Sequence, residues 1–257
     1  MSSIVSIHSF RGGTGKSNIS ANVASQLAAM GNRVGVIDTD IQSPGIHVLF
    51  GMDEEKIDKS LNDYLWGRCA IEETAYNVST RIGAGEVLVM GSDIFLIPSS
   101  IRAGEIARVL REGYDVGLLN TGFRALTEKL NLDYLIIDTH PGLNEETLLS
   151  IAISDILFII LRPDQQDFQG TAVTVDVARK LEVPELFLIV NKALTSYDFK
   201  DLRQQIETAY SSPVAAIIPL SEDVARMQSS DIFSLRFPDH PVSEEIRKVA
   251  RLIEQKT

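Results

Sequence analysis

The chain has 257 residues, a formal net charge of −11 and one cysteine, Cys69. One cysteine excludes a disulfide framework or a cysteine-ligated cluster within one chain and favours a reducing cytoplasm. No secretory leader pattern opens the chain, and no apolar run approaches the roughly 18 residues that span a bilayer. The average charge repels a phosphate backbone, so nucleic-acid binding would need a local cluster of cations. We expect a single cytoplasmic domain over residues 1–257.

Short apolar runs and helical patterns alternate along the chain. Runs typical of buried parallel strands occur at 4–9, 33–38, 132–138, 156–161, 185–190 and 214–219. Helical patterns follow them at 18–30, 103–112, 122–130, 145–153, 168–181, 199–210 and 243–255. Two short runs that flank Gly91, within 87–100, predict a hairpin. This order predicts an α/β fold, with a doubly wound, mostly parallel sheet flanked by helices.

The first strand leads through a glycine-rich turn into a helix. Glycines without a Cβ let several backbone N–H groups point at one phosphate, and the helix N-terminus adds positive potential. Lys16 would then approach the terminal phosphates, and Ser17 would offer a hydroxyl to Mg²⁺. The turn therefore predicts a nucleotide phosphate-binding loop made of Gly12, Gly13, Thr14, Gly15, Lys16, Ser17 and Asn18.

Two alternatives to this interpretation exist. A glycine-rich turn can serve close packing alone, although the strand–turn–helix context is the one that a phosphate-binding loop requires. A dinucleotide-binding loop is the sharper alternative, because Asp38 ends the second strand where a ribose-binding acid would lie. That spacing, however, puts the last glycine at Asn18 and leaves Lys16 and Ser17 without a task.

Three segments together resemble the deviant Walker A ATPases of the MinD/ParA family. They are RGGTGKS at 11–17, VIDTDIQSPG at 36–45 and LIIDTHPG at 135–142. The resemblance covers nearly the whole chain and includes VNK at 190–192 and IIP at 217–219. It implies a P-loop NTPase fold and the cofactors ATP, ADP and Mg²⁺.

Two carboxylates end buried strands beside the loop. Ligands of open parallel sheets bind at such strand ends, so Asp38 and Asp138 would face the phosphates and the metal. The resemblance implies that Asp138 is the Walker B acid, which binds Mg²⁺ through water, and that Asp38 completes the outer shell. It also implies that Asp40 orients or deprotonates the attacking water. An N-cap or a solvated loop carboxylate is the alternative for each acid.

Arg11 stands where the family carries its signature lysine. In the family that lysine reaches across a face-to-face dimer, with ATP between the subunits, to the partner's phosphates. The resemblance implies that Arg11 and Lys16 are catalytic, since a guanidinium can hold two phosphate oxygens. The alternative for Arg11 is a local salt bridge. Asn191, Lys192 and Pro219 would by resemblance lie near the adenine base, although an asparagine at a strand end is also an ordinary turn residue.

The resemblance implies a molecular switch that binds and weakly hydrolyses ATP. It would form an ATP-sandwich homodimer that positions or partitions a cargo with a stimulating partner protein. Loops 39–48 and 139–146 leave strand ends beside the γ-phosphate and would act as switch segments. The alternative is a nucleotide-gated binding module with negligible turnover. His140, inside the second loop, is ambiguous between a packed imidazole and a site residue.

Two surfaces bear on the partners. The last helical pattern places Ile246 and Ile253 on one face and mixes glutamates with its basic residues. It therefore predicts a helix packed on the core and disfavours membrane anchoring. Non-specific DNA stays open as a partner because of three arginines on one helical segment, Arg102, Arg108 and Arg111.

Overall fold

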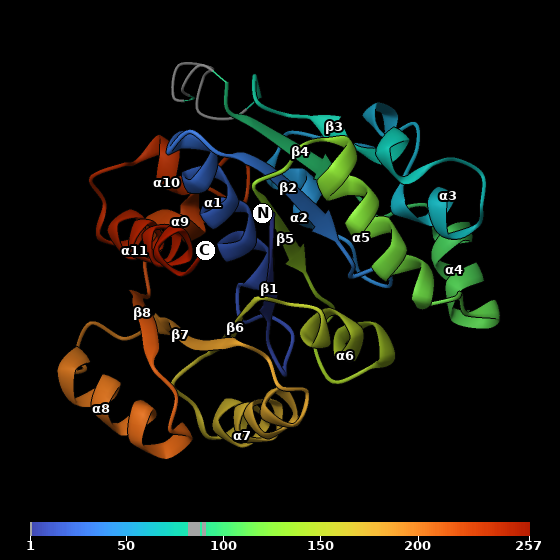
Figure 1. Cartoon of the computed structure of the whole chain (residues 1–257). Helices are drawn as coiled ribbons and strands as arrows, with labels where there is room; N and C mark the ends of the chain where they lie inside the picture. The colour runs from blue at the N-terminus through green and yellow to red at the C-terminus, as the bar shows by residue number, and fades with distance from the viewer. Residues whose placement is uncertain (1, 82–87, 89–90) are drawn as a thin grey trace.

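An eight-stranded sheet organises the protein (Figure 1). The structure is a computed structural model that describes residues 2–81, 88 and 91–257. The strand order across the sheet is β3-β4-β2-β5-β1-β6-β7-β8, and every neighbouring pair is parallel except β3 with β4. The strands are β1 (Ser3–His8), β2 (Arg33–Asp38), β3 (Tyr76–Asn77), β4 (Asp93–Ile97), β5 (Tyr134–Asp138), β6 (Ile156–Leu161), β7 (Glu185–Ala193) and β8 (Val214–Pro219).

Helices cover both faces of the sheet (Figure 1). One face carries α1 (Lys16–Ala29), α2 (Ile46–Leu49), α9 (Glu222–Arg226), α10 (Phe233–Arg236) and α11 (Pro241–Lys256). The other carries α3 (Leu61–Leu65), α4 (Ala103–Glu112), α5 (Gly117–Lys129), α6 (Glu145–Ala152), α7 (Gln165–Lys180) and α8 (Phe199–Tyr210). Two 3₁₀ turns, η1 (Glu54–Lys56) and η2 (Ile71–Thr74), lie between β2 and β3.

The central strands are apolar on both sides because both sides are covered. In β5, Ile136 packs into the core beneath α1 and α11, whereas Leu135 and Ile137 pack into the core beneath α5. All three side chains are fully buried. This continuous apolar run is the pattern expected of parallel strands.

The predicted α/β fold, with its doubly wound, mostly parallel sheet, is confirmed. The strand limits 33–38, 156–161 and 214–219 agree with the sequence prediction, whereas α5 begins at Gly117 rather than at 122. Of the predicted hairpin, the second arm forms β4, and most of the first arm lies outside the described residues.

Side chains occupy the main-chain groups of β8, the strand at one edge of the sheet. The backbone N–H of Val214 donates to Glu207 Oε1 at 2.9 Å, and that of Ile217 donates to Glu245 Oε2 at 3.3 Å. The guanidinium of Arg203 donates to the carbonyl of Val214. Helices α8 and α11 therefore close this edge with their side chains.

Within the described residues, no helix combines the length and the apolar character needed to cross a bilayer.

Candidate nucleotide site

The loop between β1 and α1 has the backbone geometry of a phosphate cradle. Gly13 and Gly15 take left-handed φ values of 78° and 94°, which residues with side chains rarely adopt. A Cβ on Gly15 would also lie 2.5 Å from Asn191 Nδ2, closer than any atom can pack. These two positions therefore require glycine, and Gly15 caps the N-terminus of α1. That helix end is a ready site for an anion.

A cavity of about 300 Å³ opens above this loop. All seven residues from Gly12 to Asn18 line it, together with Asp40 from the loop after β2 and Pro141 from the loop after β5. The structure thus brings the predicted phosphate loop together with one residue of each predicted switch segment, Asp40 and Pro141. Their convergence follows from the topology, because β1, β2 and β5 are adjacent parallel strands whose carboxyl ends meet at one edge.

Lys16 and Asp138 form the buried centre of the site. Lys16 Nζ donates to Asp138 Oδ1 at 3.1 Å, and the two side chains are 7% and 1% exposed. Ser20 Oγ, one turn further along α1, lies 2.9 Å from the same carboxylate oxygen. Asp138 Oδ2 is buried and has no hydrogen-bond partner. A buried carboxylate oxygen without a partner is costly, so this atom fits a ligand that supplies positive charge.

Asp38 lies directly beside Asp138, because the two residues are register partners in the β2–β5 pair. Its carboxylate accepts from the backbone N–H of Asp40 at 3.0 Å and of Gly45 at 3.2 Å. Complete burial and the neighbouring Asp138 raise the pKa of Asp38 to about 8. Asp38 therefore shapes the loop that carries Asp40, and an added cation would favour its charged form.

These groups fit Mg²⁺ once phosphate oxygens are also present. Among the described residues, no three His, Cys, Asp or Glu side chains gather as a self-sufficient metal site. Mg²⁺ in nucleotide sites is bound by one or two carboxylates together with substrate phosphates, so this absence is the expected one. The unpartnered oxygen of Asp138 and the hydroxyl of Ser17, which lines the cavity, are the matching donors.

Asp40 and His140 connect the two loops beside the cavity. Asp40 Oδ1 accepts from the backbone N–H of Ser43 at 3.1 Å, and His140 Nε2 lies 3.7 Å from the same oxygen. Partial burial raises the pKa of Asp40, and the positive charge of Lys16 opposes that rise. The predicted water-positioning acid therefore lies at the edge of the phosphate cavity.

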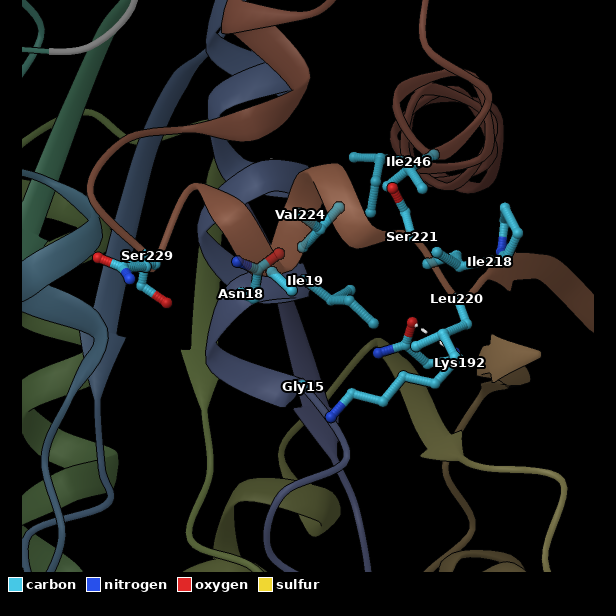
Figure 2. Close-up of a pocket in the computed structure, with 15 residues that line it drawn as sticks. Gly15, Asn18, Ile19, Lys192, Ile218, Leu220, Ser221, Val224, Ser229 and Ile246 are labelled. Atoms are coloured by element: carbon cyan, nitrogen blue, oxygen red, sulfur yellow. Dashed lines mark hydrogen bonds between the residues drawn. The ribbon is translucent and has the colours of Figure 1, made fainter. Parts of the chain in front are cut away.

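A second, largely apolar cavity of about 380 Å³ adjoins the first (Figure 2). The two share Gly15, Asn18 and Ser229. Apolar side chains from α1, α9 and α11 line the second cavity, and three of these are Ile19, Val224 and Ile246. Pro219, Asn191 and Lys192, which were predicted near the base, line it too.

The sequence did not predict helix α9, which lines this cavity. Helix α9 has five residues, too few for an apolar period, and Ile246 was assigned only to the core. Gln228 and Ser229 turn the chain with φ values of 51° and 57°, which the sequence does not announce because neither residue is glycine.

Comparison with known proteins gives the family and the fold of the chain. A family model described as an AAA domain matches residues 2–195, more than half of the chain. The septum site-determining protein MinD of Pyrococcus horikoshii, solved with Mg-ADP, has the same fold at 20% identity and a TM-score of 0.78. The alignment covers 100% of this chain and 99% of that one. The chain belongs to this AAA-domain family and has the fold of MinD.

Curated relatives extend the likeness over most of the chain. An uncharacterized ATP-binding protein of Methanocaldococcus jannaschii is 27% identical over 252 residues, which are 97% of this chain and 87% of the relative. An iron-sulfur cluster carrier protein of Aquifex aeolicus is 24% identical over 264 residues, covering 98% of this chain and 67% of the relative.

Asn191 and Lys192 make contacts with the phosphate loop that the sequence did not predict. Asn191 Nδ2 donates to the carbonyl of Thr14 at 2.6 Å, and Lys192 Nζ donates to the carbonyl of Gly13 at 2.8 Å. Figure 2 shows the Lys192 side chain running to the loop beside Gly15. The end of β7 thus braces the P-loop. A contact between Asn191 and a base stays a prediction.

Arg11 points away from the phosphate cavity of its own chain. Its guanidinium Nη1 lies 3.6 Å from Asp167 Oδ1 and 4.0 Å from Asp164 Oδ1, at the start of α7. Arg162 holds the same two acids at 2.9 and 3.2 Å. The local salt bridge therefore exists in the single chain, and the reach of Arg11 into a partner's site stays a prediction.

The arginines proposed for DNA are occupied by neighbouring groups. Arg102 lies 3.6 Å from Glu54, and Arg108 lies 2.8 Å from Glu112. The Arg108 guanidinium also stacks 3.9 Å above the Trp66 ring. Two of the three arginines are thus paired with acids, and Arg111 donates to the carbonyl of Ala107 in its own helix, which weakens the case for DNA as a partner.

Proposed function

We propose that this protein is an ATP-driven molecular switch that binds ATP with Mg²⁺ and hydrolyses it slowly. The observation that carries the proposal is the junction of two cavities at the N-terminus of α1. A glycine cradle with Lys16 suits phosphates, and the adjoining apolar cavity suits an aromatic base. The share of the chain aligned with an ATP-binding relative agrees with this choice of ligand.

Each residue of the site has a definite task in this proposal. Backbone N–H groups of the loop and Lys16 hold the phosphates and counter their charge. Ser17 and Asp138 hold Mg²⁺, with Asp38 behind them, and the ion supplies further charge neutralisation when it is bound. Asp40 orients the attacking water from the edge of the cavity.

The switch would work through a homodimer that closes over ATP. Exposed apolar side chains support this step, since Phe10 and Leu220 closely follow β1 and β8 and Val48 lies on α2, the helix after β2. They are 36%, 45% and 52% exposed. Burial of these groups between two copies would favour a face-to-face dimer. A partner protein would stimulate hydrolysis, and the cycle would position or partition a cargo.

The alternative is a nucleotide-gated binding module in which ATP locks the dimer and turnover is negligible. The carrier role of the Aquifex relative is not part of the proposal, because an iron-sulfur cluster needs several thiolates and this chain has only Cys69.

The first test is turnover of ATP by the purified chain with Mg²⁺. We expect slow hydrolysis by the wild type and loss of both binding and hydrolysis in Lys16→Ala, because the buried ammonium is removed from the phosphate cavity. Lys200→Ala, on the exposed start of α8, is the matched control and should behave as wild type. ATP binding with turnover far below about one per minute, even with cell extract, would favour the binding module.

A further inference from the structure

His140 occupies a fixed position beside the phosphate cavity. Its backbone carbonyl accepts from Thr147 Oγ1 at 3.2 Å, and Asn144 caps the helix to which Thr147 belongs. The ring is 23% exposed, and the residue that follows it, Pro141, lines the cavity. The start of the second switch segment thus holds an imidazole next to the site of phosphate chemistry.

A hydrogen bond from Nδ1 of His140 determines which ring nitrogen carries the hydrogen. His140 Nδ1 lies 2.6 Å from the carbonyl oxygen of Pro141. A carbonyl only accepts, so Nδ1 is the donor and the neutral ring presents the lone pair of Nε2 on its far side. That lone pair faces Asp40 Oδ1 at 3.7 Å.

Two acceptors at this separation need a shared donor. Neither Nε2 of the neutral ring nor an ionised carboxylate can donate to the other, and 3.7 Å exceeds the length of a direct hydrogen bond. A water molecule has two hydrogens and can donate one to each acceptor. Asp40 lines the phosphate cavity, so a water held in this way lies at the cavity's edge.

We propose that His140 is a catalytic residue that holds the attacking water together with Asp40. The water donates one hydrogen to Asp40 Oδ1 and the other to His140 Nε2, which leaves an oxygen lone pair free for the terminal phosphate. The water oxygen bonds to phosphorus while the bond to the β,γ-bridging oxygen breaks. ADP leaves with that electron pair, and one water proton passes to Asp40. This inference rests on the proposed hydrolysis.

A two-point hold on water acts on the chemical step rather than on ATP binding. His140 is not among the residues that line either cavity of the nucleotide site, and its ring nitrogens face the carbonyl of Pro141 and the carboxylate of Asp40. Loss of its ring should therefore lower kcat and leave KM nearly unchanged. A role limited to folding of the loop would change KM and stability as well.

The test compares steady-state hydrolysis by wild type, His140→Ala, His140→Gln and Glu128→Gln, with ATP and Mg²⁺. We expect His140→Ala to lower kcat at least about tenfold with KM and ADP affinity unchanged. His140→Gln should recover much of the rate, because its amide oxygen can accept from the same water. Glu128→Gln, an exposed change on α5 outside both switch segments, should match wild type.

Three results would overturn the inference. Equal kcat in His140→Ala and wild type removes His140 from the chemistry while leaving the proposed hydrolysis intact. A Gln variant as slow as the Ala variant, or a loss of ADP affinity in both, assigns His140 to loop structure. Absence of hydrolysis by wild type that still binds ATP defeats the proposed hydrolysis and this inference together.

Discussion

At the scale of single residues, His8 shows how the site imposes one protonation state. Its Nδ1 lies 2.8 Å from Thr139 Oγ1, and that hydroxyl also lies 3.1 Å from the carbonyl of Ile7. Since the hydroxyl hydrogen goes to the carbonyl, Nδ1 of His8 is the donor. Complete burial and the positive charge of Lys16 lower the pKa of His8 to about 3.

This shift predicts a pH dependence of stability. An unfolded histidine titrates near 6.5, so between about pH 6.5 and pH 3 the unfolded chain binds a proton that folded His8 does not. His8 therefore costs stability as pH falls, by about 1.4 kcal/mol per unit below 6.5. His8→Asn keeps a donor for Thr139 and does not titrate. In urea unfolding, the wild type should therefore lose stability relative to this variant as pH falls from about 7.5 to 5.5.

The comparison controls for other titrating groups, which both proteins share. The raised pKa of Asp38 acts in the opposite direction, since it favours the folded state at low pH. A stability gap that stays constant with pH would mean that folded His8 takes up a proton as easily as an exposed one.

At the scale of elements, the sequence predicts long strands and helices well and short ones poorly. The buried strands are continuous apolar runs, and their limits are recognisable at 33–38 and 156–161. Helix α7 begins at Gln165, three residues before the predicted start, because Asp164 caps it. Helices α2, α3, α9 and α10 have only four or five residues, too few to show a helical repeat of apolar residues. One of them, α9, nevertheless lines the apolar cavity beside the phosphate loop.

The same contrast holds within the site. Glycine spacing predicted a tight loop after β1, where Gly13 and Gly15 indeed take φ values that only glycine adopts easily. Strand ends predicted that Asp38 and Asp138 lie together, and the two are register partners. The bracing contacts of Asn191 and Lys192 were not predictable, since they depend on how the end of β7 meets a loop about 177 residues earlier.

Helix α9 offers a test of the base cavity. Val224 is partly buried and lines the cavity from this helix (Figure 2). Val224→Trp should fill the space and weaken ATP binding at least about tenfold, a loss of about 1.4 kcal/mol. Arg226→Ala changes an exposed side chain of the same helix and should bind ATP normally. Calorimetric titration measures both affinities, and normal binding by Val224→Trp would place the base elsewhere.

At the scale of the whole molecule, Arg11 tests whether the chain acts as a pair. Light scattering with Mg²⁺ and either ADP or ATP should show an ATP-dependent dimer in wild type and a monomer in Arg11→Ala. The reason is that the variant lacks the cation proposed to reach the partner's phosphates. Arg179→Ala, an arginine of α7 that bonds to the carbonyl of Ser211, should dimerise as wild type does.

The opposite result has a definite meaning too. An Arg11→Ala variant that dimerises normally would confine Arg11 to its contacts with Asp164 and Asp167. The chain would then have replaced the family's lysine by a residue that anchors the P-loop to α7.

The closed edge at β8 also affects how the protein behaves in a crowded cell. Glutamates on α8 and α11 occupy two of the N–H groups that would otherwise template a foreign strand. At the far edge, β3 has only two residues, too few to template a stable pairing. The chain is thereby guarded against fibrous aggregation by strand addition, and contacts between copies are left to side-chain surfaces.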